Sequence, residues 1–416
     1  MADRTLLFRG SLVQPLRKLV TGRVHPHFSP LKPARLEFGT RLYALDLARF
    51  VAMMLMMQGH ILDALVTPSV IDVGAFPWNI WHMLRGVTAP VFLMVSGVVH
   101  VFANKRDTSG RIRADVLSRR IRWALTLIGI GYLMVFPANR IWDLPYVQQS
   151  SWQVALAVNI LQLTGATILL FVAVMSSTRS VASMGFRALV TALSILALTP
   201  IMYSTYMTSA ILPAWLLPYL NASTGSLFPF FPFASYLFFG VALGAYLHAV
   251  PAEGRTAQLQ KYGWRVGGVI AALALLAHAV AWKMGIPFTE LEHAGSVALV
   301  LRRVGFVLMI FSACSWALSR TWRLRSWYSL FSAKSLYIYV IHLVILFGTP
   351  WFDGIGRTHF RQYSLADGLL VMLAIMSSTL FIAWAIDYAQ KKPWSAIVRR
   401  SFSAGAIFLS AYLLLV

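Results

Sequence analysis

Residues 49–64 read RFVAMMLMMQGHILDA, an apolar stretch that holds an arginine, a histidine and an aspartate. Apolar runs of this kind recur from residue 44 to the end of the chain, and runs of 18 or more residues are typical of transmembrane helices. The sequence of 416 residues is 58% hydrophobic and only 12% charged, whereas a soluble domain is about a quarter charged. It therefore predicts an all-α polytopic membrane protein.

Eleven apolar segments are candidate spans, which predicts about ten or eleven transmembrane helices. They cover residues 44–66, 79–102, 121–138, 152–175, 186–205, 228–249, 266–283, 297–318, 333–350, 366–388 and 397–416. Lysine and arginine gather in alternate loops between these segments, as the positive-inside rule requires. We expect one transmembrane domain over residues 41–416, in the inner or plasma membrane, with its N-terminus in the cytoplasm.

Residues 1–40 are basic, are interrupted by prolines and lack the apolar core of a signal peptide. We expect a cytoplasmic arm that either lies along the anionic membrane surface or is disordered. The net charge of +22 does not predict nucleic-acid binding, because the basic residues lie in short loops between apolar runs. Cys314, the single cysteine, excludes an intrachain disulfide and a cysteine-based metal site.

Arg49 and His60 are eleven positions apart, so a helix places both side chains on one face, separated by a rise of roughly 16 Å. Asp63 follows one turn later on the same side, within reach of the imidazole. Ionisable groups at membrane depth are costly and are functional candidates by default. The pattern indicates a polar track leading inward from the cytoplasm. The plainer alternatives are an interface anchor for Arg49 and a hydrogen bond within the helix bundle for His60.

A second polar group opens the next span, where Trp78, Trp81, His82 and Arg85 share one helical face. Tryptophans at this depth usually form the interfacial aromatic belt. A tryptophan beside an arginine can equally stack on a sugar or another polar acceptor.

Ser335, Tyr339 and His342 lie on one face of a late span. They form either a polar seam between helices or the wall of a substrate site. Arg302 and Arg303 lie in the outer half of the segment 297–318, where at least one of them is expected to face a wet cavity.

An arginine and a histidine with ten residues between them, in the first span, resemble the hallmark of the acyltransferase-three family of membrane acyltransferases. The segments APVFLMVSGVV (89–99), SRRIRW (118–123) and SLYIYVIHLVIL (335–346) are similar to the second, third and late helices of that family. Two others, VNILQLTG (158–165) and FPFFPFASYLFFGVALG (228–244), are more similar to the related heparan-α-glucosaminide N-acetyltransferase branch. That branch carries its key histidine just before the second span, where His82 is out of register. We therefore assign the catalytic role to His60 and keep His82 in reserve.

The resemblance implies transfer of an acyl group, most simply acetyl, from cytoplasmic acyl-CoA to a carbohydrate or similar acceptor on the other side of the membrane. His60 would be the catalytic base or acyl carrier, oriented by Asp63. The residues expected to bind acyl-CoA are Arg49, Arg119, Arg122 and Ser335. The phosphates of the donor require basic side chains at the entrance of the site, which the arginines supply. Acceptor binding falls to Trp81, His82, Arg85 and His342. No metal is implied, and an oligomer is compatible with these features.

Two other functions fit the same residues. The intramembrane histidine, aspartate and arginines could form the proton or solute pathway of a transporter, although the chain shows no matched halves with broken helices. The protein could also be a non-catalytic membrane assembly or sensor. Consumption of a thioester separates an enzyme from both.

Overall fold

The computed structural model describes residues 41–204 and 212–392, together with the single positions 405, 408, 411, 412 and 415. Helices dominate this part of the chain, and its strands are one short antiparallel pair, β1 (Gly348–Thr349) and β2 (Phe352–Asp353). The predicted all-α class is confirmed. The basic segment 1–40 lies outside the described residues, as does nearly all of the predicted last span, 397–416.

Seven described helices are long and apolar enough to cross a bilayer. They are α1 (Tyr43–Leu65), α2 (Trp78–Arg85) with α3 (Thr88–Phe102) as one span, α7 (Val181–Met202), α9 (Phe230–Ala249), α10 (Arg255–Lys283), α12 (Val297–Thr321) and α16 (Leu365–Gln390). Two bent helix pairs raise this number to nine. A further helix, α4 (Ala114–Met134), is apolar only from Trp123 onward, because three arginines occupy its first turns. Every predicted span from 44–66 to 366–388 overlaps one of these helices or pairs.

The two bent pairs are α5 (Gln149–Leu156) with α6 (Ile160–Met175), at 52°, and α13 (Arg325–Ala333) with α14 (Ser335–Phe347), at 66°. A continuous span, 152–175, was predicted across the first break, whereas the predicted span 333–350 begins at the second and covers α14 alone. At the first break, the backbone groups of Val158 are bonded from another part of the chain. Its N–H donates to the Ser226 hydroxyl at 2.9 Å, and its carbonyl accepts from the N–H of Phe228 at 3.0 Å. Non-helical backbone is tolerated at membrane depth only when it is satisfied in this way.

Short elements connect the long helices. They are the helices α8 (Leu217–Leu220), α11 (Phe288–Leu291) and α15 (Ile355–Thr358), and the 3₁₀ turns Pro68–Val70, Ile141–Tyr146, Ala252–Gly254 and Trp322–Leu324.

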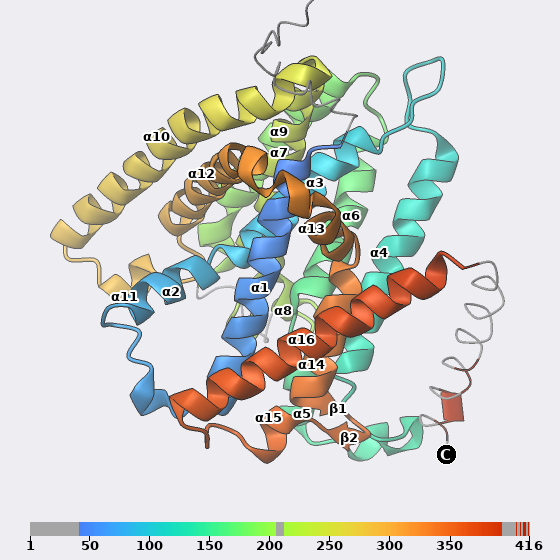
Figure 1. Cartoon of the computed structure of the whole chain (residues 1–416), viewed down its shortest axis with the longest axis vertical. Coiled ribbons are helices and arrows are strands. Elements are labelled where there is room, and N and C mark those ends of the chain that lie inside the picture. Colours follow the sequence, from blue (N-terminus) through green and yellow to red (C-terminus); the bar gives the residue numbers. More distant parts are fainter. Residues whose placement is uncertain are drawn as a thin grey trace, which may run out of the picture. The chain divides into compact units, whose positions relative to one another are not determined.

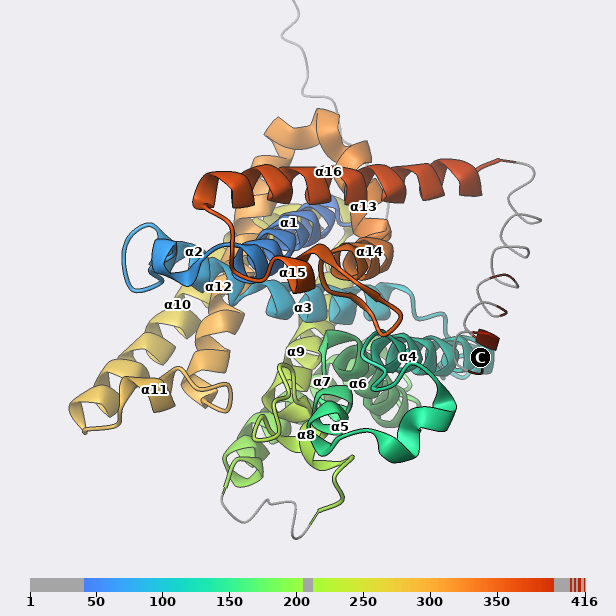
Figure 2. The ribbon, with the colours of Figure 1, turned by 90° about the horizontal axis from the view of Figure 1, so that it is seen from below.

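Helix α1 is the centre of the arrangement, because α3, α12, α13 and α16 all pack against it (Figure 1). Figure 2 shows α10 paired with α12 on one side, and the group α4, α6, α7 and α9 on the other. Helices α3 and α9 cross closely, since a Cβ atom at Gly97 would overlap the carbonyl oxygen of Leu237. Small residues at a crossing are how membrane helices approach each other.

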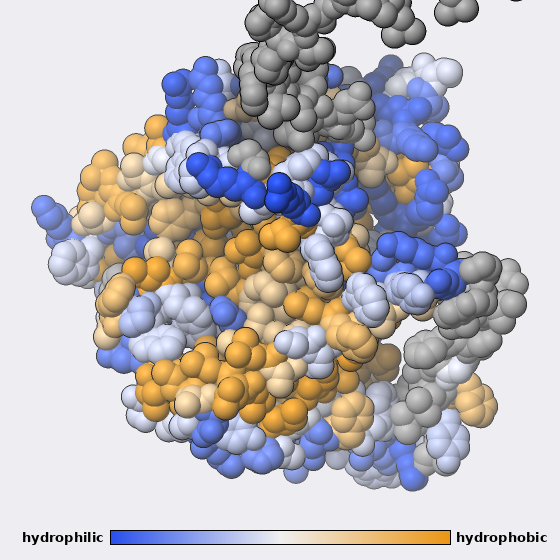
Figure 3. Space-filling model, viewed as in Figure 1, coloured by the Kyte–Doolittle hydropathy of each residue, from blue (hydrophilic) through white to orange (hydrophobic). Residues whose placement is uncertain are grey.

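The outer faces of several helices are apolar. Only 22% of the residues in the apolar windows of α10 and α16 are buried, so side chains such as Leu276 and Leu370 point outward. Figure 3 shows a broad apolar region across the middle of this view, with hydrophilic residues toward its upper and lower edges. In water, an exposed apolar area of this extent would favour aggregation. In a membrane, the hydrocarbon chains of the lipids would cover it.

Candidate functional site

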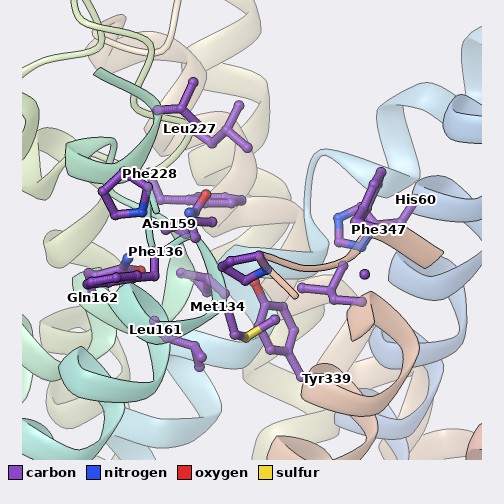
Figure 4. Close-up of a pocket in the computed structure, with 18 of the residues that line it drawn as sticks. His60, Met134, Phe136, Asn159, Leu161, Gln162, Leu227, Phe228, Tyr339 and Phe347 are labelled. Carbon is purple, nitrogen blue, oxygen red and sulfur yellow. The ribbon is translucent and has the colours of Figure 1, made fainter. Parts of the chain in front are cut away.

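A cavity of about 600 Å³ lies among α1, α3, α4, α14, the α5–α6 break and residues 227–228 (Figure 4). Its volume is in the range of small-molecule sites, about 300 to 1,000 Å³. The lining is largely apolar and includes several aromatic rings, contributed by Phe92, Phe136, Phe228, Tyr339 and Phe347. Its polar side chains include His60, Asn159 and Gln162. An apolar site with a few convergent polar groups is the usual form of a substrate pocket.

His60 on α1 and His342 on α14 are directly bonded at the edge of this cavity. The Nδ1 atom of His60 lies 3.1 Å from Nε2 of His342, and the ring planes are nearly parallel, at 8°. The Nδ1 atom of His342 lies 2.8 Å from the carbonyl oxygen of Ile338, one helical turn earlier. His342 is fully buried, and His60 is partly buried and lines the cavity.

These two bonds fix the proton positions of a neutral pair. A carbonyl oxygen can only accept, so Nδ1 of His342 carries the hydrogen and its Nε2 carries the lone pair. His60 must then donate from Nδ1, which leaves the lone pair on its own Nε2. The pair therefore holds His60 in the tautomer of a base.

Asp63 was expected to orient His60, but it binds a different residue. Its carboxylate binds the guanidinium of Arg85, with one Nη1–Oδ1 distance of 3.0 Å and a second, shorter bond from Nη2. The same guanidinium lies 4.4 Å from the ring centroid of Trp81 and crosses α1 at Gly59, where a Cβ atom would overlap it. The structure thus joins Asp63 to Arg85 and His60 to His342.

Of the four residues expected to bind an acceptor, His342 is the one bonded to His60. The other three, Trp81, His82 and Arg85, lie on α2 and do not line the cavity. No residue of α2 is buried. His82 is exposed. Tyr339, from the same sequence pattern as His342, does line the cavity and packs edge-on against the His342 ring.

A second cavity, of about 340 Å³, lies at the N-terminal end of α1. Arg49 lines it together with Arg41 and Asp46, which are paired at 2.7 Å. The hydroxyls of Ser329 and Ser332 also donate to Asp46 and so tie this end of α1 to α13. Of the residues expected to bind the acyl donor, Arg49 is thus the one that lines a cavity.

The arginines of α4 divide between its two faces. Arg119 and Arg122 are exposed, and Arg119 pairs with Asp115 at 3.1 Å. Arg120 between them is only 7% exposed, donates to the carbonyl oxygen of His100 at 2.9 Å and lies over the ring of Phe171. Sequence reasoning missed Arg120. Helical spacing could have shown that Arg120 lies on the buried face of α4. The buried residues of this helix recur every three or four positions: Val116, Arg120, Ala124, Leu127 and Gly131.

Both cavities open on the same faces of α1 and α3. On α1 and its N-cap, the second cavity is lined by Leu42, Leu45, Asp46 and Arg49, and the first by Met56 and His60. On α3, the second cavity is lined by Val95, Val98, Val99 and Phe102, and the first by Thr88, Ala89 and Phe92. Most of these positions recur at three, four or seven residues, so they lie on one broad face of each helix. On α1 the fully buried Met53 occupies the position between the two sites.

Gln162 is a second residue that sequence reasoning missed. It is fully buried in the first turn of α6 and lines the cavity. Neither atom of its side-chain amide has a hydrogen-bond partner among the residues that the structure describes. A glutamine within an apolar run, three positions after an asparagine, was the available signal.

The remaining predicted residues lie elsewhere. Ser335 begins α14 and is not among the lining residues of either cavity. Arg302 binds Glu292 at 2.6 Å, and Glu292 also lies 3.3 Å from His278. The guanidinium of Arg303 lies beside Gly86. Within residues 41–204 and 212–392, no three side chains of the ligating types gather closely enough to hold a metal ion.

Comparison with known proteins gives one match. The sequence model of a family, described as an acyltransferase domain, matches residues 42–388, which include the histidine pair and every residue that lines the two cavities except Arg41. No curated protein and no solved structure matches the chain.

Proposed function

The chain belongs to the acyltransferase-three family, and from that membership we propose that it transfers an acyl group from acyl-CoA to an acceptor held beside His60. Acetyl is the simplest acyl group, and a carbohydrate or a similar hydroxyl- or amine-bearing molecule is the acceptor. The observation that carries the proposal is the histidine pair. His60 lines a cavity of small-molecule size with a lone pair on Nε2, while His342 holds its other nitrogen.

His60 acts as the general base in this reaction. Its Nε2 removes the proton from the acceptor hydroxyl as that oxygen attacks the thioester carbonyl. The new carbon–oxygen bond forms, the carbon–sulfur bond breaks, and the thiolate of CoA takes the proton back from the imidazolium. The hydrogen bond from Nδ1 of His60 to Nε2 of the neutral His342 fixes the His60 ring. It also stabilises the positive charge that develops on that ring.

The donor enters from the end of α1 that carries Arg49. Arginine is suited to phosphate groups because its planar guanidinium forms paired, charge-assisted hydrogen bonds. The pantetheine arm is long, thin and uncharged, so it can pass between the shared faces of α1 and α3 toward His60 when it displaces the buried side chain of Met53. The basic loops then face the cytoplasm, as the positive-inside rule predicts, and the acceptor arrives from the opposite side of the plasma or inner membrane.

The acceptor binds in the cavity of about 600 Å³. Its aromatic rings suit the apolar faces of a sugar, and its few polar groups suit hydroxyls. The similarity of segments 158–165 and 228–244 to the heparan-type branch points to the same class of acceptor, since both segments contribute to this wall.

The direct test is thioester consumption by the purified protein in lipid nanodiscs. We expect steady release of free thiol from acetyl-CoA, reduced at least a hundredfold in His60→Ala, because a positioned general base contributes about 10²–10⁴ in rate. His293→Ala is the matched control, since His293 is exposed between α10 and α12 and lines neither cavity. A folded His60→Ala protein with full activity would remove the assignment of the base, and a transporter would consume no thioester at all.

A further inference from the structure

Gln162 is held in a state that the fold alone does not explain. Its side chain is fully buried, yet neither its amide N–H groups nor its amide oxygen has a partner among the described residues. Leaving a buried polar group unbonded costs roughly 1 to 3 kcal/mol, so such a group calls for an explanation, such as a bound water, a ligand or a catalytic role. Methionine, with nearly the same length and no polar atoms, would avoid this cost.

The surroundings of Gln162 keep its amide in place. It lies flat against Gly131 of α4, where a Cβ atom would come within 2.5 Å of its oxygen. It also lies in the first turn of α6, directly after the break that Ser226 and Phe228 stabilise. The first turn of a helix presents backbone N–H groups that have no partner within the helix. Asn159, which precedes this turn, lines the cavity, and its side chain does not cap the helix.

Figure 4 shows Asn159 and Gln162 on one side of the cavity and His60 on the other, with Tyr339 between them. A molecule that fills the cavity therefore has the base at one end and the wall that encloses the amide at the other, and it binds the amide when its entry opens that wall. The group at the amide end determines how the molecule is turned, and hence which of its hydroxyls reaches His60.

We propose that Gln162 is an acceptor-binding residue that holds two adjacent hydroxyl groups of a neutral acceptor. This inference rests on the proposed acyl transfer and assigns specificity within it. A carboxamide presents one donor and one acceptor side by side. Two neighbouring hydroxyls match it, because one accepts from Nε2 while the other donates to Oε1.

The charge of the lining supports a neutral ligand. No carboxylate is among the described residues that line the cavity. The guanidinium in the lining, that of Arg357, is exposed and lies 3.3 Å from Asp353. A charged ligand would thus find no unpaired opposite charge in the wall. The pantetheine arm of the donor is also neutral, but its trans amides point their N–H and C=O in opposite directions and would engage only one atom of Gln162.

The test compares two ring alcohols as acceptors, with acetyl-CoA as the donor. The first, cyclohexane-1,2,4-triol, is called the diol because its cis 1,2-hydroxyls can bind Gln162 while its third hydroxyl, across the ring, reaches His60; the second is cyclohexanol. In the wild type we expect kcat/KM to be roughly tenfold higher for the diol, as one or two neutral hydrogen bonds allow. In Gln162→Met this ratio falls to about one, and the melting temperature is equal to or above that of the wild type, because an unbonded buried amide has been removed.

Gln258→Met is the matched control. Gln258 lies on α10, away from the cavity lining, and its amide oxygen is likewise buried without a partner. This variant should keep the preference for the diol.

Each other outcome has a defined meaning. An unchanged ratio in Gln162→Met, or a melting temperature lowered by several degrees, would overturn the inference in favour of a structural role. A raised KM for acetyl-CoA would overturn it by assigning the amide to the donor. A wild-type protein that consumes no acetyl-CoA would overturn the proposed function and this inference together, whereas the first two results leave the proposed function intact.

Discussion

The Nδ1 atom of His60 lies 3.1 Å from the Nε2 atom of His342, although 282 positions separate the two residues in the chain. The bond joins the first membrane span to the second arm of a bent helix pair, so the bend between α13 and α14 helps to position the base. His342 is in turn anchored on the carbonyl oxygen of Ile338. Orientation of the imidazole therefore depends on a neutral ring and not on a carboxylate.

Replacement of His342 tests this orientation. In His342→Ala the Nδ1 atom of His60 loses its acceptor, and we expect kcat to fall about 10- to 100-fold with little change in KM for the donor. In His342→Gln the amide oxygen can accept the same hydrogen bond, so much of the activity should return. Steady-state kinetics of both variants, with melting temperatures as a check on folding, decides the matter. Equal losses in the two variants would contradict a role through the acceptor lone pair.

Arg49 is expected to bind the phosphates of the donor. Charge-assisted hydrogen bonds contribute roughly 1.5 to 3 kcal/mol each, so Arg49→Gln should raise KM for acetyl-CoA about tenfold or more. The loss should disappear with S-acetylpantetheine, a donor that has no phosphate. An equal loss with both donors would mean that Arg49 has only a structural role. Arg119→Gln and Arg122→Gln, measured in the same way, test whether the exposed face of α4 contributes to donor binding.

Gly59 and Arg85 should be strongly coupled. A Cβ atom at Gly59 would overlap the guanidinium of Arg85, so Gly59→Ala must displace that side chain from Asp63 and Trp81. We expect Gly59→Ala to lower stability in the wild type and to have much less effect in the Arg85→Ala background, with a coupling of about 0.5–3 kcal/mol. Unfolding of the two single variants and the double variant measures this term. Additive effects would contradict the contact.

The sequence predicted nearly all the described spans, because each needs only a long apolar run. It did not predict the α5–α6 break, since that depends on Ser226, which lies 68 positions away from Val158. The site was predicted in part. Arg49, His60 and His342 line the cavities or bond to a lining residue, whereas Asp63 was grouped with His60 from helical spacing alone. That spacing could not reveal that Arg85 of the next helix would bind the carboxylate first.

Glu292, in the loop between α10 and α12, should make stability depend on pH. Burial alone would raise the pKa of Glu292, but the hydrogen bond and charge of Arg302, with the charges of His278 and Arg303, hold it below its ordinary value of 4.5. A carboxyl whose folded-state pKa is lowered stabilises the fold above its ordinary pKa, and this contribution is lost as the pH falls through the folded-state pKa. The melting temperature of the wild type should therefore fall below about pH 4.5 more steeply than that of Glu292→Gln. Glu290→Gln, at an exposed position nearby, is the control and should follow the wild type.

The sidedness of the two substrates can be measured by labelling. In a Cys314→Ala background, His82→Cys at the exposed face of α2 should react with an impermeant maleimide added outside. Arg119→Cys on α4 should react only after the inner side is opened. The reverse pattern would place the Arg49 end outside and would exchange the entry sides of donor and acceptor.

Met53 has a consequence for the membrane as an electrical barrier. Arg49 and His60 share one face of α1 and are separated by a rise of roughly 16 Å, so together they span much of the bilayer with groups that attract water. The fully buried thioether of Met53 lies between them, in a helix face that is otherwise open to a cavity at either end. This apolar side chain separates the two cavities along α1 when no donor occupies the path. In the proposed reaction the donor arm would take the place of Met53 as it enters, so that the path along α1 would be filled by one or the other and would not conduct protons down their gradient.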